Sequence, residues 1–158
     1  MRALFLLWAV ACAATVGATE LVGKVVPPYP DGLRTLTGSC VSASDDYQHV
    51  CDWSIETLAD AVGIRHWVVA GSRADDGPIG LLRITDSIAH PHIAEGFDLQ
   101  AGTCRLDGAD DAHVVAVVRI DFGRAYWGNA TWARRLDFST GKLVELDPAR
   151  VDCLAIGG

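Results

Sequence analysis

The chain has 158 residues, half of them apolar, and a formal net charge of -7. Because it is acidic and has no basic run, we exclude nucleic acid and anionic membrane surfaces as its partners. Its length is typical of one domain and is sufficient to bury a core without metal or dense disulfides.

The first 18 residues have the layout of a secretory signal peptide. Arg2 precedes an uncharged apolar stretch, and Val16-Gly17-Ala18 has the small residues of a cleavage site. The stretch is shorter than the ~20 residues that a spanning helix needs, so we expect no transmembrane helix. We predict cleavage after Ala18 and a periplasmic or secreted protein. A lipoprotein anchored at Cys12 is the alternative, since Ala9-Val10-Ala11-Cys12 loosely resembles a lipobox.

Four cysteines follow the signal peptide, and an even number in an exported protein is typical of disulfides. They are Cys40, Cys51, Cys104 and Cys153. Of the three possible pairings we favour Cys40–Cys51 and Cys104–Cys153, because each joins parts of one half of the chain. A zinc site would need close CxxC pairs, and the sequence has none.

The N-terminal half begins with an extended lead-in over residues 19–38. A short strand is expected at Thr19–Val26, and the three prolines of Pro27–Gly32 then interrupt regular structure. Tyr47–Leu58 alternates with a period near two and predicts a half-buried strand. A helix over Trp53–Val62, with Ser54 as its N-cap, is the alternative.

The rest of the chain is rich in β-branched and aromatic runs separated by turn residues, which favours strands joined as hairpins. The expected strands are Arg65–Arg73, Ile79–Ile88, Phe97–Leu106, His113–Asp121, Thr131–Phe138 and Lys142–Leu146. The strand at His113–Asp121 is the most continuously apolar and is expected at the centre of the sheet. Phe122–Asn129 is expected to be irregular or a helical turn.

These patterns predict one α+β domain over residues 39–158, mostly β, in which an antiparallel sheet of hairpins is stapled by disulfides. The segments 66–73 and 113–119 are similar in sequence. Two such hairpins would fit side by side, so one continuous sheet is expected.

Several C-terminal motifs resemble those of small exported hypothetical proteins of Gram-negative bacteria. The resemblance covers roughly residues 80–158. The motifs are Gly102-Thr103-Cys104, Val114–Arg119, Thr131-Trp132-Ala133-Arg134-Arg135-Leu136-Asp137, Thr140-Gly141-Lys142-Leu143 and Cys153. The resemblance implies an exported β-rich domain with a Cys104–Cys153 bridge, and it implies no catalytic activity.

A metal site is one functional hypothesis. His90-Pro91-His92 places two imidazoles on one loop, with Asp86 and Glu95 nearby, and such ligands suit zinc or copper. Solvent-exposed loop histidines are the alternative interpretation.

A contact site is the second hypothesis. Tyr126 and Trp127 lie between expected strands beside glycines, where large aromatic side chains would be exposed to a protein or glycan of the cell envelope. No nucleophile-elbow, nucleotide-binding or zinc-protease motif occurs, so no catalytic residue or cofactor is assigned. The predicted function is a non-enzymatic binding or envelope-accessory module, with a small hydrolase or metal-binding periplasmic protein as the alternative.

Overall fold

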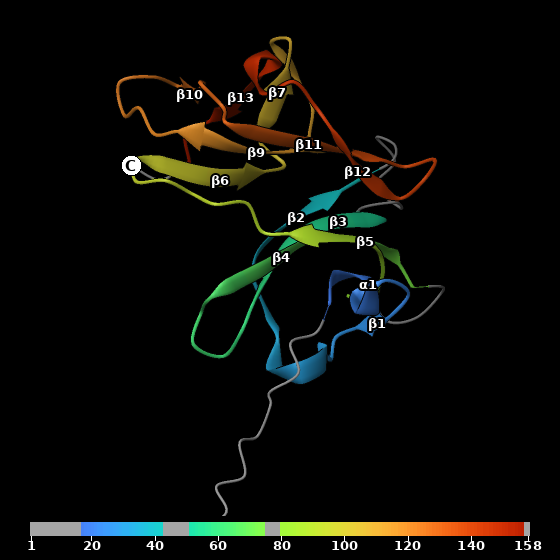
Figure 1. The fold of residues 1–158 in the computed structure, drawn as a ribbon. Helices are drawn as coiled ribbons and strands as arrows, with labels where there is room; N and C mark the ends of the chain where they lie inside the picture. The colour runs from blue at the N-terminus through green and yellow to red at the C-terminus, as the bar shows by residue number, and fades with distance from the viewer. Residues whose placement is uncertain (1–16, 43–50, 75–79, 157–158) are drawn as a thin grey trace, which may run out of the picture.

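The computed structural model describes residues 17–42, 51–74 and 80–156, which form an all-β protein of three antiparallel sheets (Figure 1). Helix in this part of the chain is limited to one α-helical turn, α1 (Ala18–Leu21), and to the 3-10 turns η1 (Pro30–Gly32) and η3 (Pro148–Arg150). The predicted α+β class is therefore wrong, because the apolar runs are short and β-branched and give no long helical stripe. The predominance of antiparallel strands is confirmed.

The first sheet has the strand order β1-β5-β4-β3-β2. Its strands are β1 (Val25–Val26), β2 (Arg34–Val41), β3 (Trp53–Ala59), β4 (Arg65–Arg73) and β5 (Leu82–Ala89). The predicted hairpin of β4 with β5 is confirmed, and Trp53–Ala59 is a strand, not the alternative helix. Residues 47–50 of that predicted strand lie outside the described residues. The predicted lead-in, residues 19–38, contains most of α1, then β1, η1 and most of β2. The strand expected at Thr19–Val26 is therefore wrong except at Val25–Val26.

The second sheet has the order β12-β11-β9-β6. It consists of β6 (Phe97–Ala101), β9 (Val114–Arg119), β11 (Trp132–Asp137) and β12 (Lys142–Glu145). β9 pairs with β11 on one side and β6 on the other, so its predicted central position is confirmed. The predicted β11–β12 hairpin is also present.

The third sheet is small, with the order β10-β13-β7-β8. Its strands are β7 (Cys104–Leu106), β8 (Ala109–Asp110), β10 (Tyr126–Trp127) and β13 (Val151–Leu154). The predicted strand over 97–106 is divided between two sheets at Gly102, whose φ is 78°. A Cβ there would lie 2.6 Å from the Cβ of Ser39, so this turn needs a glycine. The expected single continuous sheet is wrong.

Three apolar clusters hold these layers together. Ile55 and Val68 of the first sheet pack with Val115 and Leu136 of the second. Neighbouring β9 residues such as Val114 point the other way, into a cluster with the third sheet. Because side chains alternate along a strand, β9 contributes to both cores. The N-terminal segment covers part of the outer face of the first sheet, so the layers run from the third sheet to α1 and β1 (Figure 1, top to bottom).

Both favoured disulfides are present. Cys40–Cys51 joins β2 to the residues before β3, and Cys104–Cys153 joins β7 to β13. The predicted signal peptide lies almost wholly outside the described residues, as does Cys12. In the part of the chain that is described, no helix is long and apolar enough to cross a membrane.

Candidate functional site

The connection between β9 and β11 carries the aromatic residues that the sequence singles out, but Trp127 is not exposed. Its side chain is 2% exposed and belongs to the core between the second and third sheets. The indole Nε1 donates a hydrogen bond to the carbonyl oxygen of Asp121 at 2.8 Å. The expected exposure of Trp127 is therefore wrong, because Tyr126 and Trp127 form β10, which pairs with β13.

Tyr126 is half-buried, and an arginine covers its ring. The guanidinium carbon of Arg105 lies 3.4 Å from the ring centroid. Arg105 is itself held by Asp152 through two hydrogen bonds of 2.8 and 2.6 Å, and these bonds raise the pKa of the arginine. The contact of Tyr126 with Arg105 therefore links β10 to β7 across the intervening strand β13, and the covered ring offers a partner little free surface.

The exposed aromatic residue of this connection is Phe122, at 77% exposure. Its ring packs edge-on against Trp127, with centroids 5.9 Å apart and planes at 90°. The turn around it is fixed at Asp121, whose carboxylate accepts the backbone N–H of Gly123 at 3.0 Å. The carbonyl of Asp121 accepts the N–H of Arg124, also at 3.0 Å. We call residues 120–129 the Phe122 loop.

A hollow of about 450 Å³ lies at the Asp121 turn of this loop, and two arginines line it. Arg119, at the end of β9, is exposed and forms no ion pair with any residue that the structure describes. Arg124 forms an ion pair with Asp121 at 3.3 Å, yet its side chain is 76% exposed. Gly128 and Asn129 complete the wall. The Phe122 loop is therefore bordered by two accessible guanidinium groups.

The two histidines of the metal hypothesis differ in their environments. His92 is exposed, whereas His90 is half-buried and its Nε2 has no hydrogen-bond partner in the structure. Burial lowers the pKa of His90, and the nearby charge of Arg65 acts in the same direction. Within the described ranges, no group of three or more His, Cys, Asp and Glu side chains could hold a metal ion.

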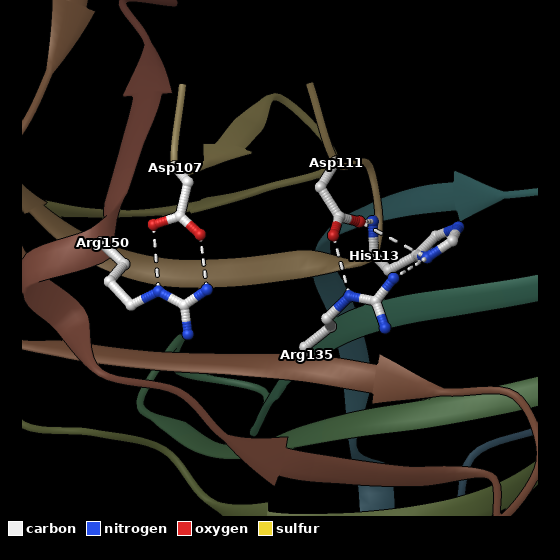
Figure 2. Close-up of polar contacts among 5 residues, drawn as sticks. All are labelled: Asp107, Asp111, His113, Arg135 and Arg150. Atoms are coloured by element: carbon white, nitrogen blue, oxygen red, sulfur yellow. Dashed lines mark hydrogen bonds and ion pairs between the residues drawn. The ribbon is translucent and has the colours of Figure 1, made fainter. Parts of the chain in front are cut away.

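A further histidine, His113, lies among charged side chains (Figure 2). Arg135 donates from Nε to Asp111 at 2.8 Å, and another of its nitrogens lies 3.3 Å from His113 Nδ1. The Asp111 carboxylate also accepts the backbone N–H of His113. No side-chain hydrogen bond joins His113 to a described serine, threonine or cysteine. Because Arg135 belongs to β11, the cluster ties the start of β9 to that strand. Figure 2 also shows the separate pair of Arg150 with Asp107, which lowers the pKa of that carboxyl.

Comparison of the chain with family models, with curated proteins and with solved structures finds no match. The family resemblance suggested by the C-terminal motifs therefore stays a prediction.

Sequence reasoning missed Phe122, although a local signal was present. Asp121-Phe122-Gly123 has an aspartate and a glycine on either side of the phenylalanine, and Asp side chains commonly fix a turn by bonding the backbone two residues on. The residue at the centre of this turn, Phe122, is largely exposed.

Proposed function

We propose that this protein is an exported, non-enzymatic binding module that contacts a protein of the cell envelope through the Phe122 loop. The observation that carries the proposal is that the Phe122 ring is 77% exposed and packs edge-on against Trp127, which is 2% exposed. Two disulfides support the export part of the proposal, because they persist in oxidising compartments.

Burial of Phe122 against a partner would contribute to the free energy of binding. Covering a phenylalanine side chain contributes about 1.5–3 kcal/mol relative to leaving it in water. The ring is already oriented by Trp127 and by the Asp121 turn, so little further conformational entropy is lost on contact. Aromatic and arginine side chains together are the residues that most often dominate binding energy at protein interfaces.

Charge favours a protein partner with carboxylates around an apolar pocket. Arg119 and Arg124 are accessible cations beside Phe122 on a molecule whose net charge is -7. Guanidinium groups pair with carboxylates in a two-point geometry. A neutral glycan, the other predicted partner, would leave Arg119 without such a contact.

The test compares what the protein and its variants capture from an extract of the producing cell's envelope. Phe122→Ser removes the ring, and Arg119→Glu reverses one charge. Val62→Ser is the matched control, because Val62 is 82% exposed but lies in the connection between β3 and β4, away from the Phe122 loop. We expect one protein to be captured by the parent and by Val62→Ser, and to be lost with the two loop variants.

Two results would count against the proposal. One is capture that Phe122→Ser and Val62→Ser weaken equally, which would indicate non-specific adhesion of exposed apolar side chains. The other is a captured species that is a glycan, released by glycosidases and insensitive to Arg119→Glu.

A further inference from the structure

The outer face of the first sheet is only partly covered. Leu21 and Val26 of the N-terminal segment pack over Leu58 and Ile84, and this half of the face is closed. The other half carries a hollow of about 400 Å³, on the opposite side of the sheet from its interface with the second sheet. Volumes of this size are typical of sites for small molecules.

The hollow exists because neighbouring strands place small side chains there. Ser54 pairs with Cys40 on β2 and with Gly71 on β4, so three small residues adjoin across the sheet. A Cβ on Gly71 would lie 3.3 Å from the Cβ of Leu82 and 3.4 Å from the Oγ of Ser54. The rest of the wall is largely apolar and includes Leu81, Leu82 and the Cys40–Cys51 disulfide.

One carboxylate, that of Glu56, lines this apolar hollow. Its Oε2 accepts a hydrogen bond from the hydroxyl of Tyr29 and lies 2.9 Å from the Oγ1 of Thr35. Burial and the adjacent Glu56 raise the pKa of Tyr29, so the phenol keeps its proton and acts as the donor in this hydrogen bond. Oε1 has no hydrogen-bond partner among the described residues.

Arg73 and Ser54 are two further polar residues of the wall, and their side chains differ in whether they have partners. Arg73 forms an ion pair with Asp52 at 3.6 Å, so its charge is compensated. Ser54 is 6% exposed, and its hydroxyl is buried without a hydrogen-bond partner. Among the described residues, the wall of the hollow therefore combines apolar side chains with the carboxylate of Glu56, which forms no ion pair, and with two buried hydroxyls that have no hydrogen-bond partner, those of Ser39 and Ser54.

We propose that this hollow binds a small apolar amine, with the ammonium group on Oε1 of Glu56 and the hydrocarbon body against Leu81, Leu82 and the disulfide. A carboxylate accepts charge-assisted hydrogen bonds from an ammonium, and these are roughly twice as strong as neutral ones. The apolar walls bury the hydrocarbon part of the ligand. The site is separate from the Phe122 loop and does not depend on the function proposed for it.

Phenethylamine is the probe, titrated into the folded, disulfide-intact protein and followed by calorimetry and by NMR shifts. Phenylethanol and phenylpropionate carry the same ring with a neutral or negative end. We expect phenethylamine to bind about tenfold more tightly than phenylethanol, and phenylpropionate not to bind. Glu56→Gln should abolish the preference for the amine. Glu145→Gln is the matched control, because that side chain is 79% exposed on β12, and should change nothing.

A second variant keeps the proposal testable if Glu56→Gln does not fold. Ser54→Val narrows the hollow, removes the unpartnered hydroxyl of Ser54 and leaves Glu56 in place, and it should weaken phenethylamine binding while the protein stays folded. The proposal is overturned if phenethylamine does not bind, if it binds no better than phenylethanol, or if binding survives both variants. Phe122→Ser should leave amine binding intact, so failure here and failure of the proposed function are distinguishable.

Discussion

Phe122 and Trp127 pack edge to face with ring centroids 5.9 Å apart, and yet one ring is 77% exposed and the other 2%. The same loop thus supplies a core side chain and a surface side chain that touch. The two residues have separate roles: Trp127 fixes the loop to the core, and Phe122 is what a partner would meet. Substitution of Trp127 should therefore lower stability, whereas substitution of Phe122 should weaken binding.

Trp127→Ala should destabilise the protein by about 3–5 kcal/mol, because it leaves a large cavity in the core between the second and third sheets. Phe122→Ala should change the free energy of unfolding by less than about 0.5 kcal/mol, since the ring is mostly in water already. Urea unfolding followed by tryptophan fluorescence and circular dichroism measures both. Equal destabilisation by the two variants would show that Phe122 is a core residue.

The two disulfides should contribute unequally to stability. Cys104–Cys153 closes a loop with a sequence separation of 49, and Cys40–Cys51 one of 11. The loop-entropy relation gives about 4 kcal/mol for the first and about 3 kcal/mol for the second. Replacing each pair with serines and measuring urea unfolding checks the order.

Chemical reduction should begin at Cys40–Cys51, because this disulfide is the more accessible of the two. Cys40 is exposed, whereas Cys104 and Cys153 are at most 2% exposed. We expect a mild thiol reagent to open Cys40–Cys51 first, with alkylated peptides mapped by mass spectrometry. First reduction at Cys104–Cys153 would contradict the buried position of that bridge.

Much of the strand content could be predicted because the evidence is local. Val114–Val118 is a continuous run of small and β-branched apolar residues, and it forms the central strand β9. The hairpin of β11 with β12 follows from the glycine in the turn between them, and Gly141 has a φ of 67°. Both signals lie within a few residues of the structure that they determine.

The division into three sheets could not be predicted, because it depends on contacts between distant residues. The strand expected over 97–106 breaks where Gly102 meets Ser39, which is far away in the sequence. The burial of Trp127 likewise depends on the pairing of β10 with β13. An aromatic residue between strands gives no local sign of whether such a partner strand exists.

Asp86 ties the first sheet to the second, and its loss should be costly. From β5, its carboxylate accepts the backbone N–H of Leu143 on β12 at 2.8 Å and lies 3.2 Å from the Lys142 ammonium. Asp86→Ala leaves that N–H without its partner, which costs about 1–3 kcal/mol. Lys142→Met is the control, because it removes a half-exposed ion pair worth about 0–1 kcal/mol and a long, exposed hydrogen bond to the carbonyl oxygen of Thr85 but leaves the backbone contact of Asp86 in place. Equal effects in thermal unfolding would show that the backbone hydrogen bond contributes nothing.

His90 should make stability depend on pH in the mildly acidic range. Burial lowers the pKa of His90 below its ordinary value of about 6.5, so the unfolded chain binds the proton more readily than the folded one. The free energy of unfolding should therefore decrease as the pH falls through about 6.5, and this contribution should level off below the depressed pKa of the folded state.

Carboxylates act at lower pH and do not obscure this effect. The pKa values of Asp60, Asp107 and Asp137 are lowered by hydrogen bonds to His66, Arg150 and Ser139, so their stabilisation is lost only as the pH falls through those depressed values, below about 4. His90→Gln should flatten the decrease measured by urea unfolding between about pH 7.5 and pH 5. His92→Gln, in an exposed side chain two residues away, should leave the decrease unchanged. An unaltered pH profile in His90→Gln would mean that burial of this imidazole does not control its protonation.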